Sequence, residues 1–132
     1  MTLVREAMVT DPRALPGSAS AQEAAELLVR PEVRTVLVVE RDQLVGCVSQ
    51  STLVERIVAA GRDPRTTPLV AIADRVPLTI GPDAPLDDAY RLMEEEDVER
   101  LPVTDGNGRL VGVLSRSGLQ RRLAEDDPAA PA

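Results

Sequence analysis

Two stretches of this 132-residue chain are near copies of each other: LVGCVSQSTL (residues 44–53) and LVGVLSRSGL (residues 110–119). Gly112 follows Gly46 by 66 residues, and upstream of the turn before each stretch the offset becomes 65, so that Val38 matches Val103. A fixed offset over most of a chain indicates an internal duplication. Two copies are too few for a solenoid, so we expect a pseudo-twofold pair in which each copy buries its apolar face against the other.

Each copy shows the same order of elements, beginning with an extended piece after Pro12 or Pro77 and continuing with a helix. In the first copy, residues 20–23 form a capping-box pattern ahead of an apolar stripe at helical spacing. In the second copy, Pro85 suits a first helical turn. The stripes that should face the core are Ala21, Ala24, Leu27 and Leu28 in the first copy, and Leu86, Ala89, Tyr90 and Met93 in the second.

Two strands and a last helix complete each copy. We predict strands at residues 35–39 and 44–48, and again at 100–104 and 110–114, with closing helices that begin near Ser51 and Ser117. Residues 105–108 (DGNG) are a strong hairpin signal, because Gly and Asn accept positive φ at little cost. We therefore divide the chain into a first motif (1–60), a linker (61–68), a second motif (69–124) and a disordered acidic, Ala/Pro-rich tail (125–132).

The absent residue types exclude much chemistry. The chain has no His, Lys, Phe or Trp, all 15 of its basic residues are Arg, and Cys47 is its single cysteine. Without His and Lys there is no Ser-His-Asp or Cys-His catalysis, no His-ligated zinc, no P-loop lysine and no Schiff base. One cysteine cannot form an internal disulfide, which favours a reducing compartment. We expect neither an enzyme nor a metal site.

The net charge and the hydropathy of the chain argue against two classes of partner, nucleic acids and membranes. A net charge of −7 argues against a nucleic-acid partner, since phosphate neutralisation needs a basic surface. The apolar runs are far shorter than the roughly 20 residues of a membrane span, and the first ten residues lack the apolar region of a signal peptide. We expect a cytoplasmic protein that does not contact a membrane.

The repeated pattern resembles a tandem pair of CBS motifs, known as a Bateman module. The likeness rests on VERLPVTD (98–105), GRLVGVLSRS (108–117), the preceding helix LDDAYRLM (86–93) and the lead-in VREAM (4–8). The resemblance implies an α/β (α+β) fold of two β-α-β-β-α motifs packed with pseudo-twofold symmetry. It also implies clefts between the motifs that bind AMP, ADP, ATP or S-adenosylmethionine, no required cofactor, and a homodimer formed through helices.

The site residues expected for such a ligand fall at the strand ends of both copies. A helix start offers unpaired N–H groups and partial positive charge, and arginine offers a planar fork for phosphate. By resemblance, Arg100 takes the place of a phosphate-contacting base, and Ser115 and Ser117 take hydroxyl positions. The candidates are Thr79, Arg100, Pro102, Ser115, Arg116 and Ser117 in the second copy, and Arg34, Ser49, Ser51 and Thr52 in the first.

Two positions depart from the family pattern. The ribose-binding aspartate would come six residues after the strand glycine, where this chain has Thr52 and Gly118. A hydroxyl is a weaker ribose partner than a carboxylate, and glycine offers none. The resemblance therefore implies a free-standing regulatory module for a partner protein that the sequence does not name, with a ligand-free dimerisation or protein-interaction scaffold as the alternative.

Each singled-out residue also has a purely structural interpretation. Ser117 can be a helix N-cap, Ser115 can bond to the backbone, both arginines can be solvated, and Thr79 can be an ordinary strand residue. The acidic run 94–97 is best explained as a solvated face, and Cys47 as a small buried hydrophobe rather than a nucleophile. The glycines of residues 106–112 lie between two strands, which argues against a dinucleotide-binding loop.

Overall fold

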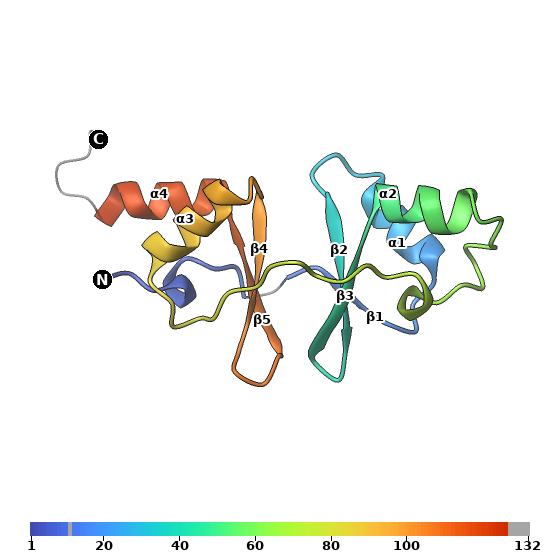
Figure 1. The fold of residues 1–132 in the computed structure, drawn as a ribbon, viewed down its shortest axis with the longest axis horizontal. Helices are drawn as coiled ribbons and strands as arrows, with labels where there is room; N and C mark the ends of the chain where they lie inside the picture. The colour runs from blue at the N-terminus through green and yellow to red at the C-terminus, as the bar shows by residue number, and fades with distance from the viewer. Residues whose placement is uncertain (11, 127–132) are drawn as a thin grey trace. The chain divides into compact units, whose positions relative to one another are not determined.

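A computed structural model describes residues 1–10 and 12–126. The chain forms two compact units (Figure 1). The first-repeat unit comprises Arg13–Pro77, and the second-repeat unit comprises Met1–Pro12 together with the chain from Leu78 onward. The α/β fold built from two copies of one motif is confirmed. These bounds differ from the predicted division into a first motif (1–60), a linker (61–68) and a second motif (69–124). Met1–Pro12 packs with the second-repeat unit, and residues 61–77, which include the predicted linker, pack with the first-repeat unit.

The first-repeat unit is a three-stranded sheet with its helices on one side (Figure 1). Strand β2 (Thr35–Glu40) pairs in parallel with β1 (Ala14–Pro16) and antiparallel with β3 (Gln43–Ser49). Helix α1 (Ala21–Leu28) starts at Ser20, whose hydroxyl accepts a bond from the Glu23 N–H at 3.2 Å, as the capping pattern predicts. The other helices are α2 (Gln50–Leu53), the π-helix η2 (Val54–Val58) that continues it, and the short 3-10 helix η3 (Leu69–Ala71).

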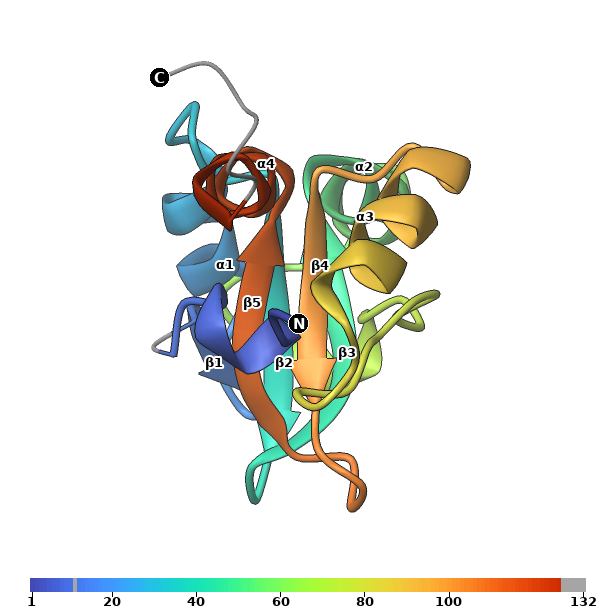
Figure 2. The same ribbon diagram turned by 90° about the vertical axis from the view of Figure 1, so that its left-hand side faces the viewer.

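The second-repeat unit repeats this plan around a hairpin. Strands β4 (Arg100–Thr104) and β5 (Leu110–Ser115) pair antiparallel, and Ile80 forms a parallel bridge to Val103 where the first-repeat unit has β1. Helices α3 (Leu86–Glu95), α4 (Arg116–Asp126) and the 3-10 helix η1 (Val4–Glu6) lie on one side of the hairpin (Figure 2). Of the tail expected at 125–132, residues 125 and 126 end α4, and residues 127–132 lie outside the described residues.

The two hairpin turns reverse the chain with different residues. In the first, Arg41 and Asp42 both have positive φ (52° and 67°), the signature of a tight two-residue turn, although neither is glycine. In the second, Gly108 has φ 82° and the Asp105 carboxylate accepts bonds from the Arg109 and Asn107 N–H groups. These bonds hold the pKa of Asp105 below its usual value. The turn predicted from DGNG is confirmed.

A separate apolar core forms in each unit, and the predicted helix stripes point into it. Ala21, Ala24 and Leu28 are buried in the first core, and Leu86, Ala89 and Met93 in the second. The strands contribute alternate residues, as a sheet covered on one face by helices requires. Those strand residues are Val36, Val38 and Val48 in the first-repeat unit, and Leu101, Val103 and Leu114 in the second.

Each sheet is completed by a crossing segment, residues 69–74 in the first-repeat unit and residues 4–9 in the second. The first exchanges two main-chain bonds between Asp74 and Cys47 (2.8 and 2.9 Å), and the second exchanges two between Val9 and Val113 (2.9 and 3.0 Å). Both segments begin with a fully buried residue, Leu69 or Val4. Residues 4–9 and residues 69–74 are 65 positions apart, so the two crossing segments are counterparts in the duplication.

The repeated strand glycines are explained by this close approach. A Cβ on Gly46 would lie 2.9 Å from the Asp74 carbonyl oxygen and 2.7 Å from the Ala73 Cβ, and one on Gly112 would lie 2.8 Å from the Val9 carbonyl oxygen. Backbone atoms cannot yield as a flexible side chain can. Glycine is therefore required at both positions.

Replacing Gly112 with alanine should lower the free energy of unfolding by about 1–3 kcal/mol, because the added methyl group overpacks the contact with the crossing segment. Urea denaturation followed by circular dichroism measures the change. Gly106→Ala is the matched control, since a Cβ at Gly106 meets nothing within 4 Å. Equal stability of the Gly112→Ala and Gly106→Ala proteins would contradict the proposed reason for the glycine.

Candidate functional site

Arg100 and Ser115 lie side by side at the open end of the β4–β5 hairpin. They are directly paired in the antiparallel register, and Ser115 is the last residue before α4. The Ser115 hydroxyl accepts a bond from the Gly118 N–H at 3.1 Å and so caps the helix. The cap predicted near Ser117 therefore falls on Ser115, with Ser117 exposed in the first turn of α4.

The strand alternation places several predicted residues on one face of this sheet. Leu101 and Val103 point into the core, so Arg100 and Pro102 point to the opposite face. Thr79 joins them, because the Ile80 N–H donates to the Pro102 carbonyl (3.1 Å) in the parallel bridge beside β4. The second-repeat unit thus gathers four of its six predicted residues on the sheet face away from its helices: Thr79, Arg100, Pro102 and Ser115.

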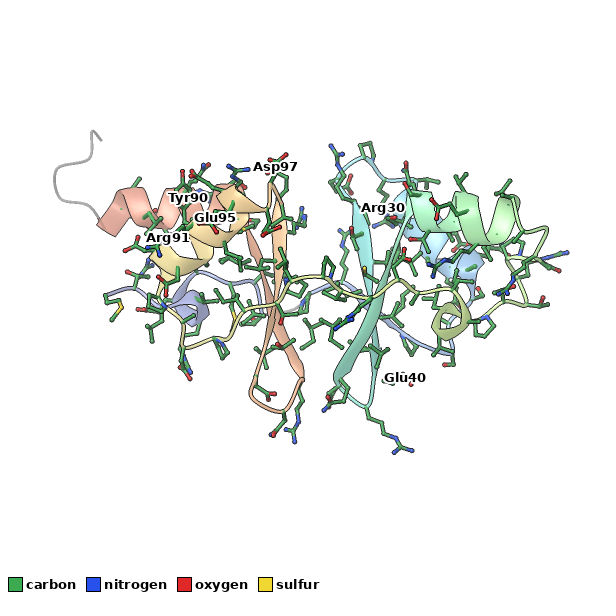
Figure 3. The ribbon with its side chains drawn as sticks, viewed as in Figure 1. Arg30, Glu40, Tyr90, Arg91, Glu95 and Asp97 are labelled. Carbon is green, nitrogen blue, oxygen red and sulfur yellow. The ribbon has the colours of Figure 1, made fainter. Side chains whose placement is uncertain are left out.

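The two arginines of this site differ in availability. Arg116 is 23% exposed, and its Nη1 lies 3.6 Å from carboxylate oxygens of both Asp97 and Glu99. Asp97 lies in the short connection between α3 and β4, near the start of β4 (Figure 3). Arg100 is exposed and has no ion-pair partner among residues 1–10 and 12–126. A phosphate would meet a free charge at Arg100, whereas at Arg116 it would compete with two carboxylates.

Some of the backbone N–H groups at the start of α4 already donate to acceptors within the protein. The Arg116 N–H donates to the Glu99 carbonyl at 2.8 Å, in addition to the Gly118 N–H bond to Ser115. Two of the first three helical N–H groups therefore already have acceptors, and this helix start retains less capacity for an anion than a bare terminus.

In the first-repeat unit, the predicted residues Ser49 and Thr52 belong to a closed hydrogen-bond network. Thr52 is 1% exposed, its hydroxyl donates to Asp74 Oδ2 at 2.6 Å, and it accepts the Ser49 N–H at 3.0 Å. Asp74 Oδ1 lies 2.7 Å from Arg56 Nη2, and Arg56 Nη1 donates to the Ile72 carbonyl at 2.7 Å. The network fastens the crossing segment to α2 and η2.

Asp74 and Arg56 are important residues that the sequence reasoning missed. One signal was available for Arg56: the 66-residue offset matches it to Arg122, which approaches Glu6 of the other crossing segment at 4.0 Å. No such signal marked Asp74, whose repeat counterpart is Val9. Its role depends on the crossing segment reaching Thr52, which is a property of the tertiary fold.

The remaining first-copy candidates, Arg34 and Ser51, lie outside this network. Both are exposed, Arg34 just before β2 and Ser51 in α2. On the sheet face that carries the second-repeat site, the matching positions hold Ala14, Thr35 and Leu37 in place of Thr79, Arg100 and Pro102. None of these three matching positions carries a guanidinium group.

Cys47 is a free, half-buried cysteine. Burial, and to a smaller extent the negative charge of Asp74, raises the pKa of the Cys47 thiol, which disfavours the nucleophilic thiolate. Across residues 1–10 and 12–126, no three His, Cys, Asp or Glu side chains gather as a metal-binding group. The helices of that same part of the chain are also too short or too polar to cross a membrane.

Asp74→Ala should destabilise the protein by about 1–3 kcal/mol, because it leaves the buried Thr52 hydroxyl without its acceptor. In a Thr52→Val background the same substitution should cost clearly less, and a double-mutant cycle by urea denaturation measures the coupling. Glu55→Ala, an exposed change on η2, is the control. Additive effects of the Asp74 and Thr52 substitutions would contradict the network.

Comparison with known proteins identifies the repeat. The CBS domain model matches residues 4–59 and again residues 69–125. The CBS domain-containing protein YhcV of Bacillus subtilis is 30% identical over the whole chain, which spans 93% of that protein.

Solved structures agree with this assignment. CBSX2 in complex with AMP is 26% identical, with a TM-score of 0.77 over 96% of this chain and 98% of that one. The CBS domain pair of MJ0100, solved with 5-methylthioadenosine and S-adenosyl-L-methionine, shows the same fold at 21% identity and a TM-score of 0.71, over 96% of this chain and 98% of that one. The chain belongs to the CBS domain family and carries two CBS motifs in tandem.

Proposed function

We propose that this CBS pair is a regulatory module that binds an adenosine-containing ligand of the AMP, ADP or ATP class, or S-adenosylmethionine. The observation that carries the proposal is the exposed guanidinium of Arg100, which has no ion-pair partner in the described part of the chain (1–10 and 12–126) and lies beside Ser115 at the start of α4. A guanidinium group next to a helix N-terminus suits a phosphate or another anionic group.

The neighbouring residues suit the rest of such a ligand. Ser115 keeps its hydroxyl proton for a phosphate or ribose oxygen, and Ser117 offers a second hydroxyl in the first turn of α4. Thr79 and Pro102 share the sheet face of Arg100, where they offer a hydroxyl group and an apolar ring to a base. The AMP complex of CBSX2, with 26% identity over nearly the whole chain, supports the nucleotide class.

The first-repeat unit contributes less to this proposal. Ser49 and Thr52 are bonded to each other, Thr52 is buried, and Ser51 and Arg34 are separate exposed groups. We assign the main ligand contacts to the second-repeat unit for this reason. Arg34, Ser49, Ser51 and Thr52 remain the candidates for a weaker second site.

In the proposed mechanism, ligand binding is coupled to a change of conformation, and no covalent bond is made or broken. A ligand that binds one arrangement of the module more tightly than another shifts the population and changes the surface that a regulated protein meets. The module acts as a cytoplasmic homodimer, is not an enzyme, requires no metal or cofactor, and does not bind nucleic acid or a membrane. The regulated protein is a partner still to be identified.

A ligand-free scaffold is the second candidate, and one observation favours it. Neither ribose position offers a free carboxylate: Thr52 is buried and bonded to Asp74, and Gly118 has no side chain. A Cβ at Gly118 would also lie 2.8 Å from the Ser115 hydroxyl oxygen, so the helix cap itself favours glycine there.

Arg100→Ala should weaken nucleotide binding about tenfold, the lower end of what a charge-assisted hydrogen bond to an exposed group contributes. Isothermal titration of the full chain with AMP, ADP, ATP and S-adenosylmethionine measures the affinity. Arg109→Ala is the matched control, because it removes an exposed arginine at the other end of the same hairpin.

The same titrations separate the two candidates. Equal affinities of the Arg100→Ala and Arg109→Ala proteins would contradict the assignment of Arg100. Absence of heat, with an unchanged melting temperature across the ligand panel, would overturn ligand binding and leave the scaffold, because a ligand that binds the native state must stabilise it.

A further inference from the structure

Two carboxylates lie beside one of the arginines of the proposed ligand site. Asp97, in the connection between α3 and β4, and Glu99, directly before β4, each place an oxygen 3.6 Å from Nη1 of Arg116. The Asp97 and Glu99 side chains are 93% and 75% exposed. At 3.6 Å these ion pairs are longer than a charge-assisted hydrogen bond of about 2.8 Å. An anionic ligand that approaches Arg116 therefore meets two solvent-exposed carboxylates.

The main chain fixes Glu99 next to the groups that would hold a phosphate. The Glu99 carbonyl accepts the Arg116 N–H at 2.8 Å, which ties residue 99 to the start of α4. Glu99 also directly precedes Arg100, which is paired with Ser115 in the β4–β5 register. Because these contacts use the main chain, a substitution of the Glu99 side chain leaves them in place.

The first repeat shows that the fold does not require a carboxylate at residue 99. The offset of 65 matches Glu99 to Arg34, which has the opposite charge and lies exposed directly before β2. The offset of 66 matches Arg116 to Gln50, so the first repeat has neither member of this ion pair. The same motif thus forms without the pair. The negative charge of Glu99 is better explained by what the site attracts or repels than by folding.

The charges around the site cancel. Arg100 and Arg116 are positive, whereas Asp97 and Glu99 are negative, so these four side chains have no net charge. Only Arg100 among them lacks an ion-pair partner within residues 1–10 and 12–126. AMP carries about two negative charges at neutral pH, and each further phosphoryl group adds about one. One free guanidinium group can pair with one phosphate, whereas additional phosphates would meet the carboxylates.

We infer that Glu99, together with Asp97, makes this site selective for an adenosine ligand with a single anionic group and against di- and triphosphates. The inference rests on the ligand site of the proposed function and adds which members of the ligand class the site accepts. AMP and S-adenosylmethionine each carry one anionic group, a phosphate or a carboxylate. ADP and ATP carry phosphates that Arg100 does not neutralise, and the two carboxylates repel them. Repulsion of a competing ligand gives specificity as attraction to the preferred one does.

The test compares ligands that differ only in the number of their phosphates. The full chain is titrated calorimetrically with adenosine, AMP, ADP and ATP, without divalent cations, which would neutralise part of the polyphosphate charge. The affinity should rise from adenosine to AMP, because Arg100 pairs with the first phosphate, and should fall again for ADP and ATP. We expect ATP to bind at least about tenfold more weakly than AMP.

Two substitutions of Glu99 separate its charge from its place in the fold. Glu99→Gln keeps the size of the side chain and should lower the ratio of the ATP to the AMP dissociation constant at least about threefold. Glu99→Arg introduces the first repeat's own residue and should lower that ratio further.

The matched control is Asp87→Asn, which also removes one exposed carboxylate. Asp87 lies in the first turn of α3, at the end of the helix away from Asp97 and beyond the Debye length of about 8 Å. This variant should leave the ratio of the two dissociation constants unchanged. Circular dichroism checks that all variants fold.

Two outcomes would overturn the inference: a wild-type chain that binds ATP as tightly as AMP or more tightly, or a ratio of dissociation constants that neither Glu99 variant lowers. Both outcomes leave nucleotide binding in place and reject only the selectivity. Absence of heat with every ligand would instead overturn the proposed function, and the selectivity with it.

Discussion

The close contact between a crossing segment and a glycine-bearing strand is the constraint on which both units depend. Residues 69–74 and residues 4–9 each add two main-chain hydrogen bonds to a sheet edge and bury a leading apolar residue, Leu69 or Val4. The approach is possible only because Gly46 and Gly112 lack a Cβ. Through this contact each repeat is completed by residues that lie outside its own strand–turn–strand segment.

The duplicated scaffold leaves each unit free to present different surface chemistry. In the first-repeat unit, the polar residues Ser49 and Thr52 bond to each other and Thr52 bonds to Asp74, so their role is structural. In the second-repeat unit, Ser115 lies at a helix start beside Arg100, which is exposed and forms no ion pair within residues 1–10 and 12–126. We connect only the second arrangement with the proposed ligand binding.

Much of the fold could be predicted from the sequence because its signals are local. The repeated LVG stretches located the strands, the 105–108 turn located one hairpin, and the stripe from Ala21 to Leu28 located a helix and its buried side. The type of the first hairpin turn was harder to predict, because Arg41 and Asp42 adopt positive φ although neither is glycine.

The candidate site could be predicted only in part, because availability is set by tertiary contacts. Alternation along β4 suffices to group Arg100 with Pro102, but the pairing of Arg116 with Asp97 and Glu99 depends on how α3 ends. Likewise, Thr52 has the sequence context of a ligand residue, yet the crossing segment brings Asp74 to its hydroxyl. Neither contact joins residues at a spacing that a sequence pattern reveals.

Amide hydrogen exchange of the full chain, resolved by residue, tests the crossing segments most directly. The N–H groups of Asp74 and Val9 should be protected as strongly as those of Cys47 and Val113, their partners in the sheets, because each pair opens together. Exchange of Asp74 and Val9 at the rate of an unstructured peptide, while the amides of β2 and β4 stay protected, would contradict the account.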